Sequence, residues 1–146
     1  MTRVTVVIAG RARASRAACR SLLDRHKDIR VVGEAGSGLE TASAAEKLKP
    51  SVLLLDMSLM DGDVTALLAV LGRKTPRTRV LLLVGGAPKP RVLDALSHGA
   101  RGYLEPRTMR TFLPRAVRAV NAGEAWVSRK MVAKIMDRLA RLTIAA

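Results

Sequence analysis

The clearest candidate for chemistry in this sequence is an aspartate that directly follows an apolar run. Asp56 comes after the apolar residues 52–55, and two more carboxylates, Asp61 and Asp63, follow in a turn that contains Gly62. Functional residues of open α/β sheets lie at the carboxyl ends of the strands, so Asp56 is placed to act as a nucleophile, a metal ligand or a helix cap. For Asp61 and Asp63 the sequence favours capping of the helix that follows.

Five short apolar runs alternate with longer helical patterns, and these elements must position Asp56. The predicted strands are 4–8, 30–33, 52–55, 80–84 and 102–104, and the predicted helices are 12–26, 37–48, 63–73, 89–98 and 108–122. Repeated strand–helix units without long linkers predict an α/β fold with a doubly wound parallel sheet. Pro114 lies inside the last helical pattern, which predicts either a kink or a later helix start.

Composition limits the classes of protein to which the chain can belong. Its 146 residues and 49% hydrophobic content fit one domain with a core, and its single cysteine excludes an intramolecular disulfide framework. No apolar run approaches the ~18 residues that span a bilayer, so we expect a soluble, cytoplasmic protein without a membrane partner. Aromatic residues make up 2%, which argues against stacking platforms for single-stranded nucleic acid.

Several short motifs around these elements occur together in one known family. They are Leu54-Leu55-Asp56, Asp61-Gly62, the run 31–35 (VVGEA) and the run 99–104 (GARGYL). With them, residues 3–122 resemble the receiver domain of bacterial two-component response regulators, and in particular the subfamily that joins a receiver to a LuxR-type helix-turn-helix. The resemblance implies a flavodoxin-like, five-stranded sheet with strand order 2-1-3-4-5 and a phosphoryl acceptor at Asp56.

The segment after the receiver resembles the linker of that subfamily. Residues 122–126 (AGEAW) precede a helical pattern at 129–141, and Gly123 separates two helices. We therefore expect a receiver-like domain at 1–122, then a linker and an additional helix at 123–146 that lead toward a DNA-binding domain outside this chain. The helical pattern places Met131, Ile135 and Leu139 on one face, where they either pack on the receiver or mediate a dimer.

The resemblance fails at most positions that carry the family's chemistry. Family members place an acidic pair for Mg²⁺ where this chain has Gly10 and Arg11. They place a Ser or Thr where it has Val84, and a lysine where it has Pro106. The family's switch aromatic is kept as Tyr103, for which the sequence favours simple surface packing over a frozen rotamer. Because Mg²⁺ binding usually needs carboxylates, we expect neither magnesium nor another cofactor.

These departures predict a regulatory module that is not an enzyme. We expect an atypical receiver of a transcriptional response regulator that works without phosphorylation, through protein contacts or dimerisation. Loss of one charge-stabilising group typically costs about 10²–10³ in rate, and here several are missing. Two alternatives stay open: a receiver with residual phosphorylation of Asp56, and a sensor that binds a small ligand in the altered pocket around Gly10, Arg11, Val84 and Pro106.

Arg11 suggests a direct substitute for the missing metal. Its guanidinium would reach Asp56 and hold that carboxylate ionised in a hydrogen-bonded pair. The simpler alternative is that Arg11 points to solvent at the start of the first helix. Arg107, beside Pro106, is a second candidate partner for Asp56.

The chain is strongly basic, with a net charge of +14 that is concentrated in residues 1–30 and 99–146. Arg13, Arg16 and Arg20 recur on one stripe of the first helix. Arg110 and Arg118 lie on the outer stripe of the fifth helix. In the family's strand order these two helices share one side of the sheet, which predicts a basic face. Such a face contacts nucleic-acid phosphates, docks an acidic partner or is simply solvated.

We expect the partner to be a protein, most simply a second copy of the chain. One candidate interface is formed by helix 89–98, strand 102–104 and helix 108–122, and the other by the first and fifth helices. Contact with DNA is expected through a C-terminal domain outside this chain.

Overall fold

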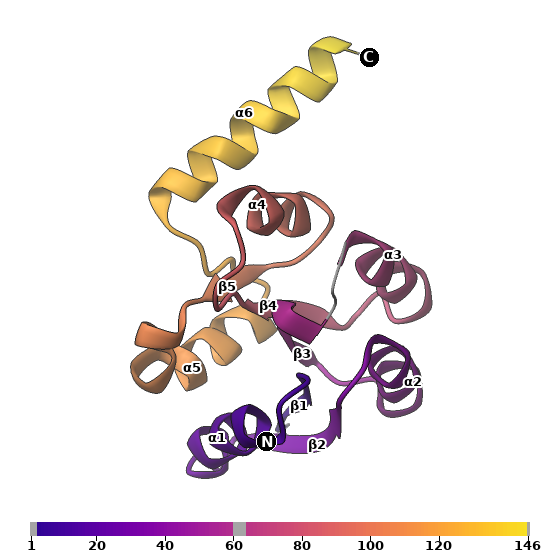
Figure 1. Ribbon diagram of the computed structural model, residues 1–146, viewed down its shortest axis with the longest axis vertical. Coiled ribbons are helices and arrows are strands. Elements are labelled where there is room, and N and C mark those ends of the chain that lie inside the picture. Colours follow the sequence, from indigo (N-terminus) through magenta and orange to yellow (C-terminus); the bar gives the residue numbers. More distant parts are fainter. Residues whose placement is uncertain (1–2, 60–63, 146) are drawn as a thin grey trace.

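The computed structural model, which describes residues 3–59 and 64–145, contains one parallel sheet of five strands. The strands are β1 (Val4–Ala9), β2 (Ile29–Ala35), β3 (Val52–Asp56), β4 (Arg79–Leu83) and β5 (Gly102–Leu104). Their order in the sheet is β2-β1-β3-β4-β5, so the predicted flavodoxin-like topology is confirmed (Figure 1). This order puts the C-terminal ends of β1, β3 and β4 side by side, which is where Asp56 lies.

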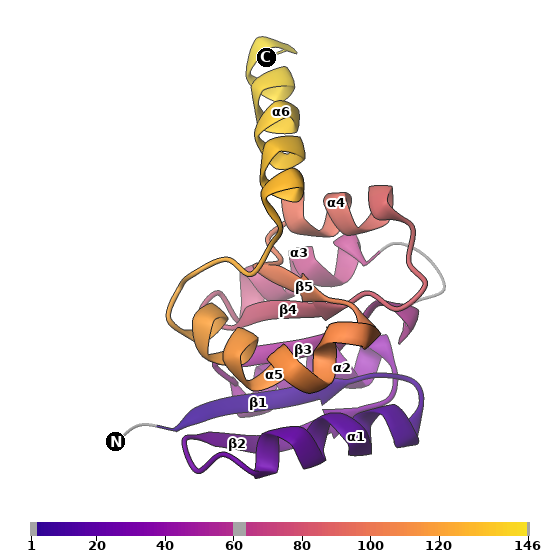
Figure 2. The same cartoon turned by 90° about the vertical axis from the view of Figure 1, so that its left-hand side faces the viewer.

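Helices cover both faces of the sheet. They are α1 (Arg13–Asp24), α2 (Gly38–Leu48), α3 (Thr65–Lys74), α4 (Lys89–Ser97), α5 (Pro106–Asn121) and α6 (Arg129–Ala145), with a short 3₁₀ helix η1 (Met57–Leu59) after β3. Figures 1 and 2 show α1 and α5 together on one face of the sheet and α2, α3 and α4 on the other. The expectation that the first and fifth helices share a side is therefore confirmed.

Two apolar clusters form the core, one on each face of the sheet. Leu54 packs with residues of α1 and α5, such as Leu23 and Val117. Its neighbours Leu53 and Leu55 pack with residues of α2, α3 and α4. Side chains of a strand alternate between its faces, so a strand buried on both sides must be apolar throughout. This explains the continuous apolar run before Asp56.

Most boundaries lie within two residues of the sequence prediction, and helix α6 extends four residues beyond it, to Ala145. Strand β2 extends to Ala35, beyond the predicted 30–33. Helix α5 begins at Pro106, two residues before the predicted start, and continues through the buried Pro114. Proline suits the first position of a helix because its missing N–H would be unsatisfied there anyway. Neither a late start nor a helix end occurs at Pro114, whose ring is instead buried in the interface of α5 with the sheet.

The linker before α6 is attached to the free edge of β5. Trp126 N donates to the Arg101 carbonyl oxygen at 3.0 Å, and Tyr103 N donates to the Trp126 carbonyl oxygen at 3.1 Å. These bonds form a one-residue parallel bridge between Gly102 and Trp126. A side chain at Gly102 would meet Trp126 backbone and Cβ atoms at 2.6–2.7 Å, so only glycine permits this approach.

Helix α6 begins on the domain and then leaves it. Its N-terminal part contacts α4, where Met131 is buried in the core and Arg138 forms an ion pair with Asp94. The C-terminal turns extend beyond the rest of the chain (Figures 1 and 2). Within the described residues, none of the helices combines the length and the apolar character required to cross a membrane.

Candidate functional site

Asp56 ends β3 at the C-terminal edge of the sheet, where the sequence placed the candidate site. Its Oδ1 accepts hydrogen bonds from the backbone N–H of Ser58 at 2.9 Å and from the Ser58 hydroxyl at 2.8 Å. The carboxylate is half-buried, and these bonds orient it over the start of η1. Asp61 and Asp63, predicted to cap α3, lie outside the described residues.

The place of the family's acidic pair is occupied by an arginine from α1. Gly10, buried after β1, faces Asp56 so closely that a Cβ on it would lie 3.4 Å from the Asp56 Cβ and 3.7 Å from the Arg16 Cγ. The Arg16 side chain runs over this glycine, and its Nη1 donates to the carbonyl oxygens of Gly10 at 2.5 Å and Arg11 at 3.3 Å. Arg16 thus lies beside the position that a side chain at Gly10 would take, with its guanidinium on the backbone of Gly10 and Arg11.

Glu34, near the end of β2, holds this arginine in position. Its two oxygens accept from Arg16 Nε at 3.0 Å and from Arg20 Nε at 2.9 Å. Burial raises the pKa of Glu34, but the hydrogen bonds from Arg20 and Arg16 outweigh it, so the pKa lies below its ordinary value. The Arg16 side chain is only 15% exposed, which shows that it is part of the edge of the sheet rather than of a solvated stripe.

The predicted pair between Arg11 and Asp56 does not form. Arg11 Nη2 donates to the Leu59 carbonyl oxygen at 3.2 Å, and the ion pairs of the described residues include none between Arg11 and Asp56. Arg11 therefore anchors the backbone after β3. Arg107, the second candidate, is 87% exposed and pairs with Glu105 at 3.2 Å.

A cavity of about 370 Å³ opens on the other side of Asp56, toward β4 and α4. Val84, buried in the position of the family's hydroxyl residue, and Arg91 of α4 line it. Gly85 allows the turn after β4 with a φ of +37°. Of the four altered positions, Val84 lines this cavity, and the exposed Pro106 lines a separate one between α1 and α5.

Tyr103, the predicted switch aromatic, is engaged with the linker. It is half-buried, and its hydroxyl donates to Ser128 Oγ at 3.1 Å. The same Ser128 Oγ accepts from the backbone N–H of Met131 at 3.1 Å and thereby caps the start of α6. The tyrosine side chain therefore contacts the linker helix, a partner that the sequence did not indicate.

The predicted basic face is divided by ion pairs. Arg118 donates to both oxygens of Asp28, at 2.7 and 3.0 Å, and its Nη2 lies 2.8 Å from His26 Nδ1. This hydrogen bonding by Arg118 lowers the pKa of Asp28 to about 2. Arg118 is thus paired with a carboxylate of its own, and Arg16 and Arg20 share the one carboxylate of Glu34, so those two keep a net positive charge. Arg13 and Arg110 are exposed as predicted.

The sheet order, the aspartate at the end of β3 and the aromatic on β5 define the class of protein. Residues 6–118 match the response regulator receiver domain, and the chain belongs to this family of two-component signalling proteins. The response regulator protein VraR of Staphylococcus aureus is 30% identical over 119 residues, which are 82% of this chain and 57% of VraR. The DNA-binding transcriptional activator DevR/DosR of Mycobacterium tuberculosis is 34% identical over 118 residues, 81% of this chain and 54% of the activator.

Solved structures agree with this assignment. The receiver domain of the putative response regulator NarL from Mycobacterium tuberculosis superposes with a TM-score of 0.78 and 28% identity, over 85% of this chain and all of that domain. The isolated receiver domain of RcsB from Salmonella enterica has the same fold, with a TM-score of 0.78 at 22% identity, over 92% of this chain and 99% of that domain. The chain spans just over half the length of the curated relatives it matches.

The residues at this edge do not suit the magnesium ion that the family implies. Mg²⁺ prefers several oxygen ligands in octahedral geometry, usually with carboxylates among them. Gly10 and Arg11 contribute no side-chain oxygen, and the stem of Arg16 covers the Gly10 side of Asp56. Within the ranges 3–59 and 64–145, no group of three or more acidic, histidine or cysteine side chains could hold a metal ion.

Proposed function

We propose that this chain is the receiver module of a transcriptional response regulator that signals without phosphorylation of Asp56. The observation that carries the proposal is the position of Arg16, whose guanidinium is bonded to the carbonyl oxygens of Gly10 and Arg11 where relatives keep acidic side chains. The module is regulatory rather than enzymatic, requires no magnesium, and acts through contacts with other proteins.

Electrostatics supports this proposal. Phosphoryl transfer depends on positioning and on cations that neutralise charge on the transferred group. Arg16 places a cation at the edge of the sheet where Mg²⁺ would approach. Because like charges repel one another strongly in a half-buried site, this cation disfavours the binding of Mg²⁺. The guanidinium is fixed by Glu34 and two carbonyl oxygens, so it does not turn toward a phosphoryl group on Asp56 without losing those bonds. Val84 and Pro106 supply neither a hydroxyl nor an ammonium group.

The role in transcription is supported by the relatives. VraR is a response regulator protein and DevR/DosR is a transcriptional activator, and both are nearly twice as long as the segment they share with this chain. The linker and α6 follow the receiver at the point where those proteins continue. We propose that contact with DNA belongs to a further domain joined through α6, and that the chain acts in the cytoplasm with its regulator.

Phosphorylation can be tested directly. We expect that incubation with a small acyl phosphate and Mg²⁺ leaves the intact mass of the chain unchanged, because the metal site and two phosphoryl contacts are absent. A receiver that keeps the acidic pair, treated in parallel, verifies that the phosphoryl donor is active. A phosphate adduct that forms on this chain and is lost in the Asp56→Ala variant would contradict the proposal and favour residual phosphorylation.

A second candidate function, sensing of a small ligand, is favoured by the cavity of about 370 Å³ beside Asp56. Its size lies within the range of small-molecule sites, and it presents one cation, Arg91, opposite one carboxylate. A zwitterionic metabolite would suit this pair. Ligand binding to the folded state raises the unfolding midpoint, so a thermal-shift screen of zwitterionic compounds, repeated with Arg91→Ala, tests it.

A further inference from the structure

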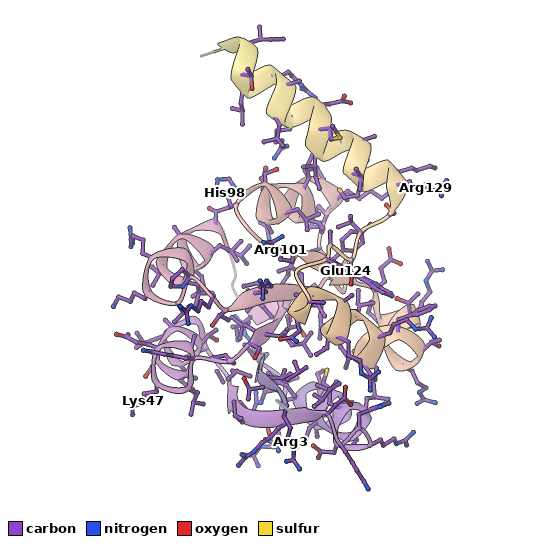
Figure 3. The ribbon with its side chains drawn as sticks, turned by 180° about the vertical axis from the view of Figure 1, so that it is seen from behind. Arg3, Lys47, His98, Arg101, Glu124 and Arg129 are labelled. Carbon is purple, nitrogen blue, oxygen red and sulfur yellow. The ribbon has the colours of Figure 1, made fainter. Side chains whose placement is uncertain are left out.

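Helix α6 carries an apolar surface that nothing in the described chain covers. Its first turns pack on α4 through Met131, which is buried, and Ile135, which is half-buried. Beyond them the exposed fractions of Val132, Met136, Leu139 and Leu142 are 40, 63, 52 and 60%. Figures 1 and 2 show these turns beyond the rest of the chain, and Figure 3 shows side chains of this part of the helix directed into open space.

The exposed apolar residues have the spacing of a helix-pairing seam. The apolar Val132, Met136 and Leu139, and after them the polar Thr143, follow one another at intervals of four, three and four residues, and we call these four residues the α6 seam. This interval repeats every seven residues and keeps the side chains on one line of the helix, as in coiled coils. The residues on either side of the line are also uncharged: Ala133 and Ala140 on one side, Ile135 and Leu142 on the other.

Beyond Arg129, the charged residues of α6 are confined to the side opposite the α6 seam. At 3.6 residues per turn, the five charged residues from Lys130 onward fall within about 100° of the helix circumference. They are Lys130, Lys134, Asp137, Arg138 and Arg141. Arg138 is directed toward Asp94 of α4, so it too points away from the α6 seam. In a chain with a net charge of +14, this separation leaves one side of the helix beyond Arg129 free of cations.

We propose that the α6 seam pairs with the α6 seam of a second copy of this chain. A surface that bound an acidic partner would border its apolar line with lysines and arginines, as flanking positions of heteromeric coiled coils do. Here the flanking positions are uncharged, so two copies meet seam to seam while their cations face outward. This inference rests on the proposed function, because it names the protein partner through which the receiver acts. Its test measures the mass of the chain in solution, so its outcome is independent of whether Asp56 is phosphorylated.

The pairing has a characteristic dependence on salt. Two chains of +14 repel one another at low ionic strength, whereas apolar contact between the seams is nearly independent of salt. Added salt therefore strengthens the association. Binding to an acidic partner or to DNA would be weakened by the same addition, so the direction of the salt effect distinguishes the two kinds of partner.

The test is the mass of the chain in solution, measured by sedimentation equilibrium over a concentration series at low and at moderate salt. We expect the wild-type chain to approach twice its 15.7 kDa at high concentration, at lower concentrations when salt is added. Leu139→Lys removes a leucine from each copy and adds a cation to the seam. Covering one leucine is worth about 1.5–3 kcal/mol, so we expect the dimer to weaken roughly a hundredfold or more.

A matched control is available on the same helix. Ile144 is 85% exposed and lies on the far side from Leu139, so Ile144→Lys makes the same change in charge and apolar content outside the seam. We expect this variant to pair like the wild type. Both positions are exposed, and circular dichroism verifies that both variants fold. A wild-type chain that stays monomeric throughout, or a dimer that Leu139→Lys leaves intact, overturns the proposal.

Discussion

A single side chain sets the electrostatics of the functional edge of this receiver. Arg16 reaches from α1 across Gly10 and binds two carbonyl oxygens beside Asp56. A Cβ at position 10 would lie 3.7 Å from the arginine stem and 3.4 Å from the Asp56 Cβ, which is ordinary van der Waals contact, so the packing itself does not require glycine there. The cation at this edge therefore comes from α1 and does not depend on the absence of a side chain at position 10.

Arg118 and Asp28 should make stability depend on pH in acid. The pKa of Asp28 is lowered to about 2 by the hydrogen bonds from Arg118, so the carboxylate stabilises the folded state while it is ionised. Above the ordinary pKa of about 4 this contribution is complete, and it is lost as the pH falls toward 2. Urea unfolding of the wild type and Asp28→Asn should thus show a stability difference at neutral pH that shrinks between pH 4 and pH 2.

Asp24 offers a control for that measurement. It is exposed at the end of α1 and takes part in no ion pair of the described residues. Asp24→Asn should therefore leave the difference from wild type flat over the same pH range. If Asp28→Asn behaves like Asp24→Asn, the link between Arg118 and Asp28 does not contribute to stability in solution.

At the scale of elements, the linker protects the open edge of the sheet. A short β5 leaves N–H and C=O groups unpaired, and edges of this kind invite pairing with other chains. The backbone hydrogen bonds of Trp126 with Arg101 and Tyr103 pair some of these groups. The Tyr103 hydroxyl donates to Ser128, the residue that caps α6. The linker, β5 and α6 therefore form one connected unit.

Substitution of Gly102 should detach the linker from the edge of β5. In Gly102→Ala the new methyl group would meet Trp126 backbone and Cβ atoms at 2.6–2.7 Å, and overpacking of this kind typically costs about 1–3 kcal/mol. Trp126 is the only tryptophan of the chain, so its fluorescence reports on the linker. We expect a red-shifted emission and a lower unfolding midpoint.

Gly72 provides the comparison for Gly102. It lies inside α3, where a Cβ would meet nothing within 4 Å, and alanine favours helix over glycine by about 0.5–1 kcal/mol. Gly72→Ala should therefore stabilise the chain and leave the Trp126 emission unchanged. An unchanged emission in Gly102→Ala as well would show that the linker is not held at the edge of β5.

For the whole molecule, the positive charge of the folded chain is not gathered on one face, as the sequence had predicted for the first and fifth helices. The predicted basic face is interrupted where Arg16 and Arg20 pair with Glu34 and where Arg118 pairs with Asp28. The remaining surplus is divided between separate surfaces, including the charged side of α6. Scattered cations of this kind attract polyanions weakly and without preference for sequence.

We accordingly expect this chain alone to bind duplex DNA only weakly. Fluorescence anisotropy with a short labelled duplex should show binding that is lost as salt rises from about 50 to 200 mM, and that is equal for unrelated sequences. Binding that persists at the higher salt, or that prefers one duplex, would show that the receiver and α6 form a specific DNA site.

The sequence by itself determined the architecture and the location of the site. Hydrophobic periodicity is local, so the alternating strands and helices could be predicted, and Asp56 followed from its place after a buried strand. The sequence also predicted which family positions are replaced, at Gly10, Arg11, Val84 and Pro106.

Tertiary structure alone decided which side chains meet. The sequence suggested Arg11 as a partner of Asp56 because Arg11 itself stands at one of the two positions of the missing acidic pair. The fold instead brings Arg16 over Gly10, since Glu34 at the end of the neighbouring strand β2 holds it there. Ion pairs and caps between distant elements depend on strand order and helix position, and these contacts have no periodic signal in the sequence.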